Sequence, residues 1–182
     1  MDSLLVRHVE PNDFPQIVDY FRNSDDEFLL AMGVDKRKLP EREKWLAILH
    51  KNYAAPIPQT QFYYLIWLLN DRAVGHSNIN KIAYGQEAFM HMHAWQKDNR
   101  RRGLGSEFIK LCIPQYFWNF RLQTLYCEPY AHNPAPNRIL EKTGFTLVRT
   151  YETVPGWINF HQPVNRWRMD VDTFRELYRP TD

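Results

Sequence analysis

The chain has 182 residues, of which 44% are hydrophobic and 15% aromatic, so it is long enough to bury a sizeable core and is not a disordered chain. Its formal net charge is only +2, which argues against a nucleic-acid binder. These values predict one globular domain spanning residues 1–182.

Cysteine content and hydropathy favour a cytoplasmic location. Cys112 and Cys127 are too few for a disulfide framework or a zinc cluster, and their apolar surroundings predict buried free thiols. Met1 leads straight into Asp2, without the pattern of a signal peptide. The apolar run over 62–69 is far too short to span a membrane, so no membrane partner is expected.

The first third of the chain predicts one strand followed by three helices. Alternation indicates a strand over 3–9, and the Asn-Asp pair at 12–13 is typical of a helix cap. Apolar residues then recur at helical spacing over 14–21. A short helix through Leu30 and a longer one starting at Pro40 complete this part.

The middle of the chain predicts a meander of three antiparallel strands over 61–69, 73–82 and 87–95, separated by short turns. A helix starting near Gly103 follows. Pro114 is expected to kink or end this helix, because proline lacks the N–H that continues the hydrogen-bond pattern.

The last part of the chain predicts a strand, a helix and two more strands, over 122–127, 133–143, 145–151 and 164–171. Helices therefore alternate with strands after an antiparallel meander. This order fits an α/β fold with a mixed sheet, which the family resemblance given below implies.

One basic glycine loop lies between a predicted strand and a predicted helix: Arg100-Arg101-Arg102-Gly103-Leu104-Gly105-Ser106. Glycines let the backbone approach a ligand closely, and the first turn of a helix offers unpaired N–H groups to an anion. This favours a phosphate site, although three arginines before a helix are also typical of a solvated loop. The spacing matches neither the P-loop nor the dinucleotide-binding fingerprint.

A second stretch gives this loop a context: Asn133-Pro134-Ala135-Pro136-Asn137-Arg138-Ile139-Leu140-Glu141-Lys142-Thr143-Gly144-Phe145. Arg-x-x-Gly-x-Gly, then a helix, a strand and Asn…Glu-Lys-x-Gly-Phe, resembles the GNAT superfamily of acyl-CoA-dependent N-acyltransferases. The Glu-Lys-x-Gly-Phe ending is most similar to the ribosomal-protein N-terminal acetyltransferases.

The resemblance implies a central, mostly antiparallel sheet of about seven strands, with helices on both faces, that splays after the strand ending at Trp95. Acetyl-CoA would occupy the splay, with its pyrophosphate at the loop from Arg100 to Ser106. Its pantetheine arm would pair with the backbone of His93, Ala94 and Trp95. Asn133 matches the family asparagine that faces the cofactor arm.

Two positions depart from the family pattern. Leu140 stands where many members carry a tyrosine that protonates the leaving thiolate, and Pro136 stands where the ribosomal branch usually has serine. The thiolate is therefore expected to take its proton from water, from the product ammonium, or from Tyr130 or Tyr126.

Candidate catalytic groups lie in a polar row on the meander. His91 and His93 share one strand face, as do His76, Asn78 and Asn80 on the preceding strand. Such a floor is often a site, because buried polar groups cost free energy unless they are paired. Satisfied core histidines are the alternative. A zinc site is disfavoured, because no third ligand accompanies His91 and His93.

Glu128, at the end of the strand beside the splay, is the other candidate base, and an exposed strand-end charge is its alternative interpretation. We therefore predict an N-acetyltransferase that moves an acetyl group from acetyl-CoA to a primary amine by direct attack. A non-catalytic module that binds acyl-CoA or a polyanion is the alternative. The acceptor amine stays open between a protein N-terminus and small molecules, and homodimer formation also stays open.

Overall fold

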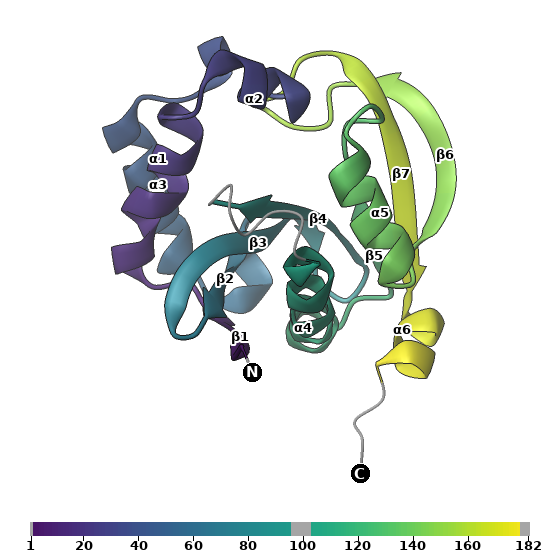
Figure 1. The fold of residues 1–182 in the computed structure, drawn as a ribbon. Helices are drawn as coiled ribbons and strands as arrows, with labels where there is room; N and C mark the ends of the chain where they lie inside the picture. The colour runs from purple at the N-terminus through teal and green to yellow at the C-terminus, as the bar shows by residue number, and fades with distance from the viewer. Residues whose placement is uncertain (1, 96–102, 179–182) are drawn as a thin grey trace.

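The computed structural model describes residues 2–95 and 103–178, and its centre is one seven-stranded sheet (Figure 1). The strand order is β1-β2-β3-β4-β5-β7-β6, and only β4 and β5 pair in parallel. The strands are β1 (Leu4–His8), β2 (Tyr63–Leu69), β3 (Arg72–Ala83), β4 (Glu87–Ala94), β5 (Thr124–Cys127), β6 (Thr146–Thr153) and β7 (Gln162–Asp170). The predicted mixed, mostly antiparallel sheet of about seven strands is confirmed.

Helices cover both faces of this sheet, as predicted. The helices are α1 (Phe14–Arg22), α2 (Asp26–Ala31), α3 (Arg42–Tyr53), α4 (Leu104–Phe120), α5 (Pro134–Lys142) and α6 (Val171–Leu177), with 3-10 turns η1 (Pro11–Asp13), η2 (Lys36–Lys38) and η3 (Ile57–Gln59). Alternation along β2 separates two cores: Leu65 and Trp67 pack with α4, whereas Ile66 and Leu68 pack with α1, α2 and α3.

Pro114 does not end the helix, as one form of the prediction had it, because α4 continues past it to Phe120. An interior proline costs about 3 kcal/mol through its missing hydrogen bond and ring clash. The turns on either side bury Ile113, Tyr116 and Phe120 completely. Tertiary packing of this kind outweighs local propensity.

Sequence reasoning missed α6, which follows β7 directly. The Asp170 side chain accepts a hydrogen bond from the Thr173 amide at 3.0 Å and so caps the helix. Phe174 then stacks on Phe117 with ring centroids 4.3 Å apart. The aspartate before Val-Asp-Thr was the available signal.

The connection between β6 and β7 is bonded to the segment after α2, across the face that carries α1 and α3 (Figure 1). We call this set of contacts the cross-face tie; it joins Gly33, Val34, Asp35 and Lys38 to Ile158, Asn159 and Gln162. Its shortest bonds are Lys38 Nζ to the Asn159 carbonyl at 2.6 Å and Gln162 Nε2 to the Gly33 carbonyl at 2.7 Å.

None of the described helices has the length and apolar character needed to cross a membrane.

Candidate active site

The sheet opens between β4 and β5. The parallel β4–β5 ladder ends at the pair Met90↔Cys127, whereas the β3–β4 ladder continues to Gly75↔Ala94. β4 therefore runs on beyond the point where β5 stops. This is the splay that the family resemblance implied, and it starts one residue before His91.

The first turn of α4 offers an anion site. Gly103 has a left-handed backbone with φ of 76°, and a Cβ built on it would meet no atom of residues 2–95 and 103–178 within 4 Å. Leu104 anchors the turn on the core below, and the Ser106 hydroxyl donates to the Gly103 carbonyl at 2.8 Å. The open space and the N–H groups of the helix start fit a pyrophosphate. Arg100, Arg101 and Arg102 lie outside the described residues.

Gly105 allows α4 to approach α5. A Cβ at this position would lie 2.8 Å from Ile139 Cδ1, so a larger residue would push the two helices apart. The predicted cofactor loop therefore contains glycines with two different roles. Gly103 leaves open space at the N-terminus of α4, and Gly105 allows close packing of α4 against Ile139 of α5.

The predicted pantetheine segment is only partly available. The Trp95 amide donates to the Val74 carbonyl at 2.9 Å, and its indole Nε1 donates to His76 Nδ1 at 2.7 Å. Both donor groups of Trp95 are therefore committed to β3. Ala94 pairs with Gly75 in the same ladder.

Asn133 caps α5, with its side-chain oxygen accepting from the Ala135 amide at 3.3 Å. The neighbouring Asn137, which sequence reasoning missed, connects α5 to β7. Its oxygen accepts from Trp167 Nε1 at 2.8 Å and Asn165 Nδ2 at 2.9 Å. Leu140 is completely buried, so the place of the family tyrosine is filled by core packing.

The histidine row lies on one face of β3 and β4, as predicted, with the pairs His76↔His93 and Asn78↔His91. His93 packs against α1, with its ring 4.9 Å from the ring of Phe21 and 5.6 Å from that of Tyr20. Burial, followed by the neighbouring His91, lowers the pKa of His76 to about 3. His76 and His93 therefore have the surroundings of core residues.

His91 differs from the other two histidines. Burial and then the charge of Lys81 lower its pKa to about 4, against an opposing effect of Glu128, so the imidazole is neutral at pH 7. Its Nε2 atom is buried without a hydrogen-bond partner among residues 2–95 and 103–178. Ser77 Oγ donates to the His91 carbonyl at 2.7 Å and holds the backbone in place. Such a nitrogen can hydrogen-bond a ligand.

The side chain of Glu128 is only 4% exposed, which excludes the interpretation as an exposed strand-end charge. Its Oε1 accepts from Arg166 Nε at 2.5 Å and, over a very short bond, from the Tyr151 hydroxyl. Arg166 Nη2 also donates to that hydroxyl at 2.8 Å. Burial and the Glu128 bond raise the pKa of Tyr151. Glu128 is thus a paired carboxylate inside a closed three-residue network.

Aromatic rings lie against this network, and we call Phe89, Tyr126 and Tyr151 the aromatic floor. Phe89 stacks on Tyr126 with centroids 5.2 Å apart, and the Arg166 guanidinium lies 5.3–5.6 Å from the rings of Phe89, Tyr126 and Tyr151. Burial is the largest single effect on Arg166 and lowers its pKa, but the hydrogen bonds and charges of Glu128 and Tyr151 together outweigh it, so the pKa is raised. Arg166 therefore keeps the positive charge that balances Glu128.

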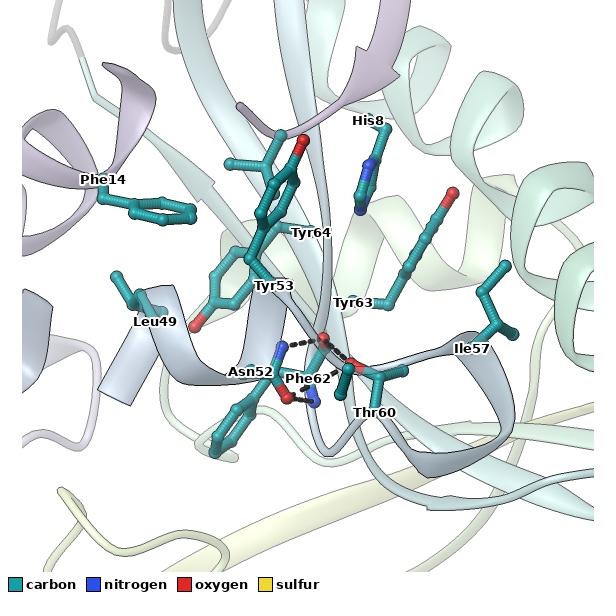
Figure 2. Close-up of a pocket in the computed structure, with 12 residues that line it drawn as sticks. His8, Phe14, Leu49, Asn52, Tyr53, Ile57, Thr60, Phe62, Tyr63 and Tyr64 are labelled. Carbon is teal, nitrogen blue, oxygen red and sulfur yellow. Dashed lines mark hydrogen bonds between the residues drawn. The ribbon is translucent and has the colours of Figure 1, made fainter. Parts of the chain in front are cut away.

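A separate pocket of about 180 Å³ lies between α3 and the start of β2 (Figure 2). The His8 ring is stacked between Tyr53 and Tyr63, with centroids at 5.7 and 4.6 Å. Asn52 binds the neighbouring segment, because its Nδ2 donates to the Phe62 carbonyl and its Oδ1 accepts from the amides of 61 and 62. The pocket contains none of the predicted site residues, and Asn52 fixes the chain that leads into β2.

No cluster of three or more histidine, cysteine or acidic side chains that could hold a metal ion occurs within residues 2–95 and 103–178. Both cysteines in this part of the chain are buried free thiols, and burial raises the pKa of Cys112 to about 12. An inert thiol of this kind is unsuited to nucleophilic attack.

Solved structures with the same fold cover almost the whole chain. They include RimL, a ribosomal L7/L12 alpha-N-protein acetyltransferase in complex with coenzyme A (14% identity, 94% of this chain and 96% of that chain, TM-score 0.74). A spermidine N-acetyltransferase from Vibrio cholerae with CoA and spermine has a TM-score of 0.77 (14% identity, 94% and 97%). The aminoglycoside acetyltransferase AAC(6')-Ib with coenzyme A has a TM-score of 0.71 (13% identity, 96% and 98%).

At these identities the structures show a shared fold and do not identify the acceptor substrate of this chain. No curated protein matches the chain. A sequence model described as the acetyltransferase (GNAT) domain matches residues 3–146. The prediction of an acetyl-CoA-dependent N-acetyltransferase is thereby confirmed at the level of the family: the chain belongs to the GNAT acetyltransferases.

Proposed function

We propose that the protein acetylates a primary amine that binds on the face of the sheet carrying His91, with coenzyme A held in the opening between β4 and β5. The observation that carries this proposal is the end of the β4–β5 ladder at Met90, directly before the neutral His91, whose Nε2 has no hydrogen-bond partner in the described part of the chain. A donor site and an acceptor site can thus meet at one point of the sheet.

The N–H groups of Gly103 to Ser106 would bind the pyrophosphate, with Arg100 to Arg102 next to them in the chain. The backbone from His93 to Trp95 would bind the pantetheine arm, apart from the Trp95 amide that β3 already uses. When bound, coenzyme A supplies the thioester. The protein's own task is to orient the amine and to accept its proton.

His91 is the best candidate for that proton, directly or through water. Its Nε2 is unmatched among the described residues, whereas Glu128 Oε1 already accepts two hydrogen bonds. A pKa of about 4 keeps the ring neutral and able to accept a hydrogen bond, and makes it a weak base. His93 stays the alternative on the same face. Glu128 would then act through its negative charge and through the hydrogen bond that it accepts from the Tyr151 hydroxyl.

Position 140 is leucine, so no tyrosine there can protonate the leaving thiolate. An ordinary thiol has a pKa near 8.5, so water or the product ammonium can supply the proton. Tyr130 and Tyr126 stay the candidate side-chain acids. The two buried free thiols agree with a reducing compartment, and we keep the cytoplasm as the proposed location.

Replacement of Gly103 with leucine tests the cofactor site. A side chain there would fill the space in front of α4, so we expect the affinity for acetyl-CoA to fall at least about tenfold. Gly85→Leu is the matched control, because Gly85 also has a left-handed backbone (φ 77°) and open space around its Cα. Calorimetric titration with acetyl-CoA measures both variants. Equal affinities in two folded variants would refute the site.

Thiol release from acetyl-CoA with a panel of primary amines tests the activity itself. Release that depends on the amine, with acetylated product detected by mass spectrometry, is the expected result. Binding of acetyl-CoA without transfer to any amine would support the non-catalytic alternative.

A further inference from the structure

A pocket of about 530 Å³ adjoins the site on the face of the histidine row. We call it the acceptor-side pocket; three separate segments form it, contributing Pro58, Gln59, Thr60, Gln61, Phe62, Asn80, Lys81, Ile82, Gly156 and Trp157. Asn52 fixes the first of these segments, and the cross-face tie anchors the connection that carries the last.

The pairing of β3 with β4 links the pocket to the proposed reaction centre. Asn80 pairs with Phe89, two residues before His91, and Phe89 stacks on Tyr126 within the Glu128–Arg166 network. These residues share one face of the sheet, since their register partners are directly opposite. A ligand with its amine at His91 can therefore extend over Phe89 toward Asn80.

Lys81 is turned into this pocket by an irregularity in β3. Its backbone is left-handed, with φ of 47°, where the register shifts between Asn80 and Ala83. Its Nζ donates to the Pro155 carbonyl at 2.8 Å and lies 4.8 Å from the centroid of the Phe89 ring. A cation thus stands between the pocket and the reaction centre.

The other polar and aromatic groups of the pocket suit a flat, uncharged ligand. Asn80 Oδ1 is buried with no hydrogen-bond partner within the described part of the chain, so it can accept from a ligand N–H or O–H. The Trp157 ring is 47% exposed and packs edge-on against Trp45. Phe62 adds a further apolar surface. Aromatic walls with a few polar groups, here Asn80 together with Gln59, Thr60, Gln61 and Lys81, are typical of small-molecule sites.

The charge of the pocket disfavours acceptors that carry several positive charges. None of the ten lining residues is acidic, and one of them is a lysine. The adjacent Glu128 is already balanced by Arg166 at 2.5 Å. A molecule with several ammonium groups would meet Lys81 with no carboxylate to compensate it.

We infer that the acceptor is a monoamine whose remaining part is planar, carries no positive charge, and donates a hydrogen bond to Asn80 in the acceptor-side pocket. This inference rests on the proposed transferase function and narrows its substrate class. It disfavours polyamines and aminoglycosides, the ligands of some proteins with the same fold.

Four amines test the inference by thiol release from acetyl-CoA: tyramine, phenethylamine, spermidine and a tyrosine-headed tripeptide amide. We expect kcat/KM for tyramine to exceed that for spermidine at least tenfold. The tripeptide distinguishes a free monoamine from a peptide N-terminus with the same chemistry. Equal or better turnover of spermidine would overturn the inference and leave the transferase function intact.

Transfer to no amine would instead refute the proposed function. The pocket is then tested by calorimetric titration of tyramine and of spermidine into the protein saturated with coenzyme A. Saturable binding of tyramine alone would support the inference about the pocket. Absence of tyramine binding, or tighter binding of spermidine, would overturn it.

Two substitutions locate the effect at Asn80. Asn80→Asp adds a carboxylate to the pocket and should lower the tyramine-to-spermidine ratio of kcat/KM at least tenfold. Asn12→Asp makes the same change in the exposed turn η1 and should leave the ratio within twofold. Asn80→Leu should remove the advantage of tyramine over phenethylamine, which lacks the donor hydroxyl. Unchanged ratios in the folded Asn80 variants would overturn the inference.

Discussion

His91 is a histidine that the fold keeps neutral. The residue is half-buried, and the pKa falls to about 4 because burial of the ring is the largest effect, with the charge of Lys81 lowering it further and the charge of Glu128 opposing it. In the proposed reaction, such a ring would accept the proton that the amine loses. In the neighbouring His76, by contrast, Nδ1 accepts a hydrogen bond from Trp95 Nε1.

Replacement of His91 with alanine should therefore lower kcat by about 10²–10⁴, the range for loss of a general base. The affinity for acetyl-CoA should stay the same, because the cofactor contacts are backbone groups. Stopped assays of thiol release and calorimetric titration measure the two quantities. His93→Ala is the companion variant, and we expect it to lower thermal stability more than turnover. Unchanged kcat in His91→Ala would assign His91 to the core.

At the scale of elements, the cross-face tie depends on one glycine. Gly33 has φ of 78°, and a Cβ there would lie 1.9 Å from Gln162 Oε1. The Gln162 side chain is 1% exposed and donates to the carbonyls of Gly33 and Phe160, so it has no room to move away. The turn after α2 and the start of β7 are therefore fitted to each other.

Gly33→Ala should destabilise the protein by roughly 2–4 kcal/mol, from the left-handed backbone and the displaced Gln162 bonds together. Gly85→Ala carries the same backbone strain with open space around it, and should cost only about 1 kcal/mol. Urea unfolding of both variants gives the comparison. Equal losses would mean that the contact with Gln162 has no energetic weight.

Sequence patterns located much of the site because its parts are local. Alternation placed His91 with His93 on one face of their strand and Asn78 with His76 on one face of the preceding strand, and the glycine spacing located the start of α4. The partners of Glu128 escaped prediction, because Arg166 lies 38 residues away and meets it only through β5–β7 pairing. The acceptor-side pocket escaped for the same reason, since it joins three segments that are far apart in sequence.

At the scale of the whole molecule, the two neutral histidines His76 and His91, the first buried and the second half-buried, make stability depend on pH. His76 and His91 bind protons only near pH 3 and 4 when folded, but near pH 6.5 when unfolded. Between these values the unfolded chain binds more protons than the folded chain. The contribution of these histidines to the free energy of unfolding is therefore fully present above pH 6.5 and is lost as the pH drops toward 4. One such histidine contributes on the order of 3 kcal/mol.

Urea midpoints at pH 7 and pH 4.5 measure this dependence. The window lies mostly above the range where carboxylates with lowered pKa values, such as Asp13 and Asp170, take up protons. The double variant His76→Gln, His91→Gln should lose less stability between the two pH values than the native protein does. An identical loss would place the acid sensitivity elsewhere.

Under the proposed function, the cross-face tie also sets the order in which the acceptor site is assembled during synthesis. The side-chain bonds of the tie join residues 121 to 129 positions apart, and one wall of the acceptor-side pocket is Gly156 and Trp157. A ribosome that has made β1 to β5 has made a sheet with His91 in place and no second wall for the amine. Because translation proceeds at about 5–20 residues per second, an interval of seconds separates the appearance of the reactive floor from the closing of its substrate site. A nascent chain held at that stage would present the aromatic floor to the solvent and to chaperones.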